Sequence, residues 1–292
     1  MRLRGCLAAI LTACAAVNAQ DSITLHDAAR NRDIPIKVYY PSGGTGALPL
    51  IVFSHGFGAN DSYYKYLGQA WSQAGYIVIL PTHADSDSAA IGFKSLKNLK
   101  DPKWGFDQQV ERTGDVAFVI SSIGQIEREI PHLNGRVDAS HIGVSGHSEG
   151  AGTALLVGGA TATPPGGSAR SFRDRRVSAV LAMSPQGPGE EGFTEQSWND
   201  MRIPAMTMSG TKDFGIGRQS PSWRVEPFDH MPAGDKFHVL VNGANHVTFA
   251  VGGRFRSCIL SETTAFWDTY LKDLKPAQAR IATTGACTVS LK

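Results

Sequence analysis

Short apolar runs alternate with helical hydrophobic patterns along most of the chain. The run IPIKVYY (34–40) alternates with a period of two, which is typical of a half-buried strand. Further apolar runs predict buried strands at 48–54, 76–81, 141–146, 178–184, 205–210 and 237–243. Amphipathic stretches predict helices at 61–74, 107–129, 149–158 and 261–273. This order predicts an α/β fold with a mostly parallel central sheet and helices on both faces.

The pattern is continuous, because no internal repeat or linker divides it. We therefore expect a single domain over residues 20–292. Three polar segments are assigned to no element: 82–105, 161–175 and 185–200. Long loops in compact domains often carry function, and loops that follow parallel strands border the ligand crevice of an open sheet. Each of these segments could therefore border a site.

The N-terminus, residues 1–19, has the layout of a secretory signal peptide. Basic residues precede a short apolar run, and Val17–Ala19 fits a small-x-small cleavage site. The run is too short to span a bilayer, so we expect a secreted or periplasmic protein. An alternative stays open, because Leu11–Cys14 resembles a lipobox that would make Cys14 a lipid-anchored terminus.

Removal of this segment also balances the charge of the chain. The full sequence has 28 basic and 26 acidic residues, and loss of Arg2 and Arg4 leaves 26 of each. A balanced chain is not typical of a polyanion binder, so no nucleic-acid partner is expected. No later stretch is apolar enough to cross a membrane, so no transmembrane segment is expected.

Cys258 and Cys287 are the cysteines that remain after residue 19. An even number in an exported chain predicts one disulfide. It would close a loop of about 30 residues and contribute about 3–4 kcal/mol on the loop-entropy model. The alternative is a pair of buried, unlinked thiols.

The stretch GVSGHSEGAG (143–152) places Ser148 between a predicted strand and a predicted helix. Gly146 and Gly150 flank it in the Gly-x-Ser-x-Gly pattern of a nucleophile elbow. The turn leaves no room for side chains at the flanking positions and holds the serine hydroxyl above the sheet edge. Ser148 is therefore the predicted nucleophile. The alternative is a packed glycine-rich turn with a capping serine.

A serine nucleophile needs a histidine base, which on this fold follows the last strand. His246, in NGANHVTF, has that position and is the predicted base. His230 precedes the last predicted strand, and His238 falls inside it. We expect His238 to belong to the core.

The base in turn needs an acid that holds its tautomer, and on this fold the acid lies between the serine and the histidine in sequence. Asp213, in SGTKDFG, follows the strand at 205–210 and is the predicted acid. Asp229 and Asp235 are the competing carboxylates, and both lie nearer the start of the last strand.

Two backbone N–H groups are expected to stabilise an oxyanion. One belongs to Glu149, the residue after the nucleophile. The other belongs to Phe57, in the loop FSHGFGAN (53–60) after an earlier strand. We expect His55 to brace this loop.

The carboxylate of Glu149 is unexpected beside a developing negative charge. At ~7 Å and an effective dielectric constant of ~20, the two charges would repel by about 2 kcal/mol. An acid in the first turn of a helix stabilises the helix by about 0.3–1 kcal/mol. We expect the side chain to point away, to be paired or to be screened, and only the N–H to serve catalysis. Possible partners are Arg170, Arg173, Arg175 and Arg176.

Together these motifs resemble the α/β-hydrolase superfamily. The resemblance is closest to its dienelactone-hydrolase-like and platelet-activating-factor-acetylhydrolase-like serine esterases, which neighbour bacterial cutinases and polyester hydrolases. It covers residues 23–275 and includes GVSGHSEGAGTALLVGG, AMSPQGPG, SGTKDFG and NGANHVTF. Dienelactone hydrolases use a cysteine nucleophile, so the serine here makes lactone cleavage doubtful. A C-terminal disulfide also recurs in secreted cutinase-like enzymes.

The resemblance implies a secreted serine carboxylic-ester hydrolase with Ser148, Asp213 and His246 as its triad. A small-molecule or a polymeric ester is the expected substrate, and a polyester hydrolase is the alternative. A binding protein that kept the fold and lost turnover is the alternative from another class. No cofactor and no metal are expected, because His26, His83 and His132 are isolated along the chain.

Overall fold

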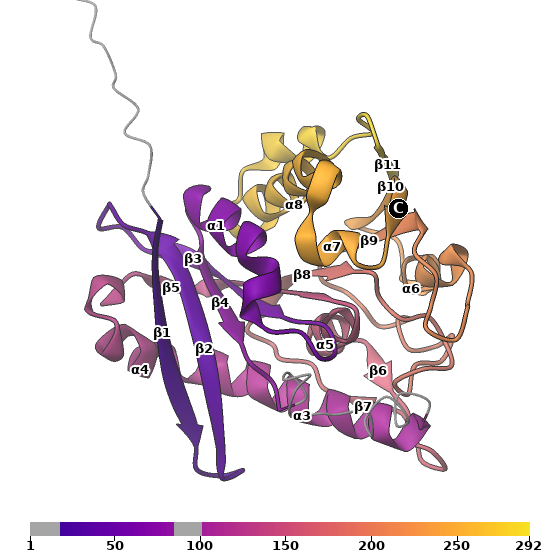
Figure 1. The fold of residues 1–292 in the computed structure, drawn as a ribbon, viewed down its shortest axis with the longest axis horizontal. Helices are drawn as coiled ribbons and strands as arrows, with labels where there is room; N and C mark the ends of the chain where they lie inside the picture. The colour runs from indigo at the N-terminus through magenta and orange to yellow at the C-terminus, as the bar shows by residue number, and fades with distance from the viewer. Residues whose placement is uncertain (1–17, 85–100) are drawn as a thin grey trace, which may run out of the picture.

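A nine-stranded sheet forms the centre of the computed structural model, which describes residues 18–84 and 101–292 (Figure 1). The strand order is β1-β2-β4-β3-β5-β8-β9-β10-β11. The pairs from β4 to β10 are parallel, whereas β1–β2, β2–β4 and β10–β11 are antiparallel. The strands are β1 Asn18–Asp27, β2 Arg32–Pro41, β3 Leu48–Ser54, β4 Ile77–Pro81, β5 Val137–His147, β8 Val177–Met183, β9 Ala205–Lys212, β10 Lys236–Asn245 and β11 Cys287–Leu291.

Helices cover both faces of this sheet. α1 and α8 lie on one face, and α3 and α5 lie on the other (Figure 1). The α-helices are α1 Lys65–Gln73, α3 Pro102–Ser121, α4 Ile123–Glu129, α5 Glu149–Gly158, α6 Glu226–His230, α7 Thr248–Val251 and α8 Arg256–Leu271. The 3-10 helices are η1 Asp61–Tyr64, η2 Pro131–Leu133, η3 Pro221–Arg224, η4 Gly253–Phe255 and η5 Lys275–Arg280. A small hairpin pairs β6 Thr161–Ala162 with β7 Arg170–Ser171.

The central strands are buried on both faces, which explains why they read as continuous apolar runs. In β3, Leu50 and Val52 pack into the core under α3 and α5. Ile51 and Phe53 point the other way, into the core under α1 and α8. Each strand therefore joins two hydrophobic cores.

The predicted α/β-hydrolase fold is confirmed, and the seven predicted strands are all present. The prediction missed the edge strands β1 and β11, which carry mixed polar and apolar residues. The single helix predicted over 107–129 is two helices, α3 and α4, which are separated at Ser122, and the prediction began too late. α3 starts at Pro102 because Asp101 caps it, accepting a hydrogen bond from the Lys103 N–H.

Residues 1–17, which hold most of the predicted signal peptide and Cys14, lie outside the described residues. Asn18 and Ala19 begin β1 and pair with Pro41 and Tyr40. Cleavage after Ala19 would shorten β1 by these two positions. In the described ranges, no helix is long and apolar enough to span a membrane.

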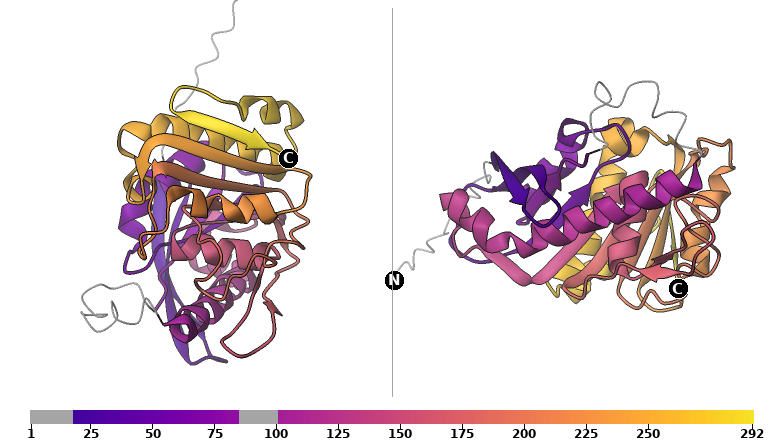
Figure 2. Two further views of the ribbon diagram at one scale, coloured as in Figure 1. Left: turned by 90° about the vertical axis from the view of Figure 1, so that its right-hand side faces the viewer. Right: turned by 90° about the horizontal axis from the view of Figure 1, so that it is seen from below.

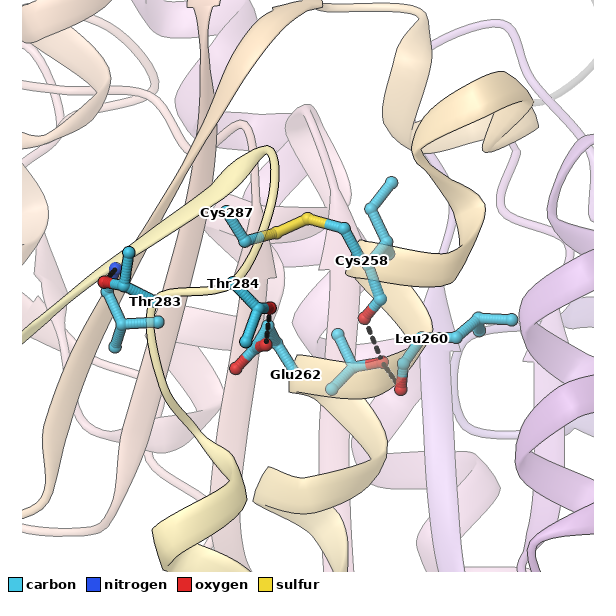
Figure 3. The surroundings of a disulfide bond; sticks show 9 residues. Cys258, Leu260, Glu262, Thr283, Thr284 and Cys287 are labelled. Carbon is cyan, nitrogen blue, oxygen red and sulfur yellow. Dashed lines mark hydrogen bonds between the residues drawn. A yellow bond between two sulfur atoms is a disulfide. The ribbon is translucent and has the colours of Figure 1, made fainter.

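The predicted disulfide between Cys258 and Cys287 is confirmed (Figure 3). Cys258 lies on α8, which covers one face of the sheet. Cys287 begins β11, the edge strand beside β10 at the C-terminal end of the chain (Figure 2). The bridge therefore ties the covering helix to the edge of the sheet.

Replacing both cysteines with alanine should lower the free energy of unfolding by about 3–4 kcal/mol, because the unfolded chain regains the entropy of an open loop. Ester turnover per folded molecule should stay unchanged, because neither cysteine lines the cavity described below. Urea unfolding of the variant and the wild type measures the difference. Equal midpoints and slopes for the two proteins would contradict the prediction.

Candidate active site

A cavity of about 370 Å³ opens at the carboxyl ends of the parallel strands. The loops after β3, β5, β8 and β9 line it, as expected for an open α/β sheet. Of the three unassigned polar segments, 185–200 borders the cavity, and 82–105 borders it through residues 101–105. Residues 85–100 lie outside the described residues. None of the cavity-lining residues belongs to 161–175, which holds the β6–β7 hairpin.

Ser148 sits in the strained turn between β5 and α5, with φ 56° and ψ −123°. A Cβ atom at Gly146 would lie 2.0 Å from the carbonyl oxygen of Gly150. A Cβ atom at Gly150 would lie 2.0 Å from the carbonyl oxygen of Ser54. Both positions therefore need glycine, and the turn has the geometry of a nucleophile elbow.

The structure brings Ser148, His246 and Asp213 together. His246 Nε2 lies 2.9 Å from Ser148 Oγ, and His246 Nδ1 lies 3.0 Å from Asp213 Oδ1. A carboxylate only accepts, so Nδ1 carries the proton and Nε2 is left to accept the serine O–H. This arrangement can remove the proton from Ser148 during attack on an acyl carbon.

The carboxylate of Asp213 is fully buried and is held from two further sides. The Ser184 hydroxyl donates to Oδ2, and Arg224 Nε lies 2.7 Å from Oδ1. Arg224 also donates from Nη1 to the backbone carbonyls of Ser184 and Pro185, at 2.8 and 3.1 Å. The sequence analysis missed Ser184 and Arg224, because no motif marks either residue.

The histidines and aspartates that competed for the base and acid roles lie away from Ser148. His238 is 3% exposed within β10, and burial lowers its pKa to about 4, so it belongs to the core as expected. The ring of His230 stacks on Trp198 with centroids 6.1 Å apart. Asp235 immediately precedes β10, at the opposite end of the strand from the triad histidine, and Asp229 is exposed near the end of α6.

Phe57 and Glu149, the predicted oxyanion donors, both line the cavity with Ser148. Glu149 is the first residue of α5, where a backbone N–H has no partner within the helix. His55 braces the other loop, as expected. Its Nδ1 donates to the Gly56 carbonyl at 2.7 Å, and its Nε2 accepts the His83 N–H at 3.1 Å.

A directed chain of hydrogen bonds joins the Phe57 loop to the backbone of His246, the predicted base. His147 Nε2 lies 3.0 Å from the His246 carbonyl, which only accepts, so Nε2 carries the proton. Burial lowers the pKa of His147 well below its usual range, so the ring is neutral and Nδ1 accepts from the Tyr64 hydroxyl at 2.9 Å. Tyr64 accepts in turn from the Gly56 N–H at 3.1 Å.

The carboxylate of Glu149 is buried and paired. Its Oε2 lies 3.2 Å from Nη2 of Arg112, and the two residues are 4% and 1% exposed. Arg112 belongs to α3 and was not among the arginines proposed from the sequence. Helical spacing gives no signal for this contact, because α3 and α5 meet only through the tertiary fold.

A second carboxyl group, on Glu191, lies beside this pair at the cavity wall. Gln109 Nε2 donates both to Glu191 Oε2 at 2.7 Å and to the Glu149 carbonyl at 2.8 Å. Burial, together with the negative charges of Glu149 and Glu190, raises the pKa of Glu191 well above its usual range. Glu191 therefore keeps its proton to a higher pH than an exposed glutamate does.

Among the described residues, no group of three or more His, Cys, Asp or Glu side chains is placed to hold a metal ion.

Comparison with known protein families agrees with this geometry. A family model described as PETase, PET hydrolase-like, matches residues 35–272. The chain belongs to this PET hydrolase-like family. The match confirms the resemblance to the α/β-hydrolase ester-hydrolase branch, and it spans the sequence from β2 to the end of α8.

This PET hydrolase-like chain is also similar to platelet-activating factor acetylhydrolase of Canis lupus familiaris. The two are 29% identical over an alignment of 137 residues that covers 37% of this chain and 31% of that relative. The chain thus matches less than a third of the relative's length, so the similarity concerns a shared part of the fold.

The raised pKa of Glu191 makes the stability of the protein depend on pH. Between the pKa of an unfolded glutamate and that of folded Glu191, the folded state binds one more proton than the unfolded state. The free energy of unfolding should therefore fall as the pH rises through this window. In Glu191→Gln this contribution should be absent, because the amide stays neutral at every pH.

Urea unfolding of wild type and Glu191→Gln at pH 5 and pH 8 tests this linkage. The wild type should lose more stability than the variant on going to pH 8. Glu195→Gln, at an exposed position, is the matched control and should follow the wild type. Identical pH profiles for wild type and Glu191→Gln would contradict the assignment.

Proposed function

We propose that the chain is an exported serine carboxylic-ester hydrolase that works through an acyl-enzyme intermediate. The observation that carries the proposal is the pair of contacts from His246 to Ser148 Oγ and Asp213 Oδ1, at 2.9 and 3.0 Å. Membership of the PET hydrolase-like family supports the same reaction class.

In the proposed reaction His246 Nε2 takes the proton of Ser148 as Oγ attacks the ester carbonyl carbon. Backbone N–H groups of Phe57 and Glu149 stabilise the oxyanion. The C–O bond then breaks, and the alcohol leaves with the proton from His246. Water, activated by the same histidine, attacks the acyl-enzyme and releases the acid. Asp213 keeps the imidazole in its tautomer throughout.

Export is part of the proposal. The signal-like segment at residues 1–19 and the disulfide between Cys258 and Cys287 support it, because disulfides persist in oxidising compartments. Lipid attachment at Cys14 is the alternative. The mass of the mature protein distinguishes the two, since a lipidated terminus would begin at residue 14.

The Ser148→Ala variant should lose at least about 10³-fold in turnover of p-nitrophenyl esters while its fold stays intact, because alanine has no hydroxyl that could form the acyl-enzyme. His246→Ala should lose a similar factor. His230→Ala is the matched control and should retain full activity, since its ring lies on Trp198.

Labelling with a fluorophosphonate probe completes this test. The wild type and His230→Ala should label, and Ser148→Ala should not. A wild type that neither labels nor turns over esters would overturn the enzyme proposal in favour of a binding protein. Labelling of Ser148→Ala at the wild-type rate would show a different nucleophile.

A polymeric ester is the second candidate substrate, and one observation favours it. Large apolar side chains are exposed directly beside the catalytic loops. Phe214 follows Asp213, Val247 follows His246, and Ile216 lines the cavity. Such side chains at the mouth of a site suit contact with an extended apolar surface.

The double variant Phe214→Ser/Val247→Ser should therefore release product from a polyester film about tenfold more slowly, since burying each of these side chains against the film would contribute about 1 kcal/mol or more. Turnover of p-nitrophenyl acetate should stay near the wild-type rate. Leu291→Ser is the matched control, because Leu291 is similarly exposed but lies on the edge strand β11, where it pairs with Phe237 at the opposite end of β10 from His246. Equal rates of product release from the film by the wild type, the double variant and Leu291→Ser would argue against a polymeric substrate.

A further inference from the structure

Arg112 lies between the two segments that carry the predicted oxyanion donors. It is 1% exposed on α3. Its Nη1 donates to the His55 carbonyl at 2.5 Å and to the Ser54 hydroxyl at 3.2 Å. Its Nη2 lies 3.2 Å from the Glu149 carboxylate. One guanidinium thus contacts the loop after β3 and the first residue of α5.

We propose that Arg112, with Glu149 as its counter-ion, is a positioning residue that fixes the backbone N–H groups of Phe57 and Glu149 relative to each other. This inference rests on the proposed ester-hydrolase function. It gives the Glu149 side chain a role that acts through Arg112, whereas the sequence alone suggested a role for the backbone only.

The contact of Arg112 with the His55 carbonyl restrains the loop after β3. Only Gly56 separates His55 from Phe57, so fixing the His55 carbonyl restricts the orientation of the next peptide planes. Glycine is otherwise permissive at such a position. The Arg112 bond therefore limits where the Phe57 N–H can point. A misplacement of about 1 Å can cost on the order of 10²-fold in rate.

Arg112 and Gln109 together restrain the first residue of α5. The carboxylate of Glu149 contacts Arg112, and its carbonyl accepts a hydrogen bond from Gln109 Nε2 at 2.8 Å. Gln109 and Arg112 are three residues apart on α3 and face the same side. Two side chains of one helix therefore hold the residue whose N–H is the second donor.

The positive charge of Arg112 also compensates the negative charge of Glu149. A lone buried carboxylate at this position would oppose an oxyanion by about 2 kcal/mol. Arg112 is equally buried and opposite in sign, so the pair presents little net charge to the reacting atoms. A planar, forked guanidinium can serve a carbonyl and a carboxylate at once, whereas a lysine ammonium is a point charge on a flexible stem.

A role in stability alone is the competing explanation, and general energetics weaken it. Burying an ion pair costs desolvation energy, and well-packed apolar residues in its place are often equally stabilising. A purely structural pair would change the unfolding free energy and leave the kinetic constants of the folded enzyme unchanged. Kinetics of folded variants therefore separate the two explanations.

The principal variant is Arg112→Lys, assayed with p-nitrophenyl esters. We expect kcat to fall about 10–100-fold, by analogy with the loss or displacement of one oxyanion donor, with KM little changed. The inhibition constant of a phenylboronic acid, whose tetrahedral adduct on Ser148 places an oxygen at the oxyanion position, should rise in parallel.

Arg136→Lys is the matched control. Arg136 is 8% exposed and donates to the backbone carbonyls of Pro41, Gly43 and His132, remote from the cavity. Its replacement should lower stability without changing kcat. If Arg112→Lys and Arg136→Lys are similarly stable and have the same kcat, the inference is overturned while the proposed function stays intact.

Glu149→Gln keeps the test decisive if Arg112→Lys does not fold. The amide leaves the backbone N–H in place and removes the charge that holds Arg112, so kcat should fall about tenfold with KM little changed. Wild-type kcat in folded Glu149→Gln would overturn the inference. A wild type without ester turnover or probe labelling would overturn the proposed function, and this inference with it.

Discussion

The close contact between the start of α5 and the end of β3 is the constraint on which the site depends. The backbone at Gly150 approaches the Ser54 carbonyl so closely that a Cβ atom there would lie 2.0 Å from its oxygen. This contact forces the chain to turn sharply at Ser148, where φ is 56°. It also brings the N-terminus of α5 beside the loop that carries Phe57. The positions of Ser148, the proposed nucleophile, and of both predicted oxyanion donors therefore follow from one backbone contact.

Two buried arginines then fix the groups around that turn. Arg224 contacts the Asp213 carboxylate and the backbone after β8, and Arg112 contacts the Glu149 carboxylate and the backbone after β3. Each guanidinium joins a carboxylate to a backbone carbonyl of a loop. Desolvation makes such pairs costly, so their placement at the loops of the triad agrees better with positioning than with stability.

Neutral side chains link the loop that carries Phe57 to the loop that carries His246. The chain from the Gly56 N–H through Tyr64 and His147 to the His246 carbonyl has one donor and one acceptor at each step. Burial raises the pKa of Tyr64 to about 12 and lowers that of His147, so neither group changes its charge near neutral pH. The loops thus stay linked through groups whose charge is constant, which suits the base role proposed for His246.

The fold class, and the three residues Ser148, Asp213 and His246 that lie together in the cavity region, could be predicted from the amino-acid sequence. Apolar runs indicate the buried strands. The glycines around Ser148 form a local sequence motif, and the order of serine, acid and histidine along the chain can be read directly from the sequence. The tertiary structure alone decided what surrounds them. The contacts of Arg112 with Glu149 and of Arg224 with Asp213 join different elements of the fold, so no spacing along the chain encodes them. The raised pKa of Glu191 likewise depends on burial and on neighbouring charges, which exist only once the chain has folded.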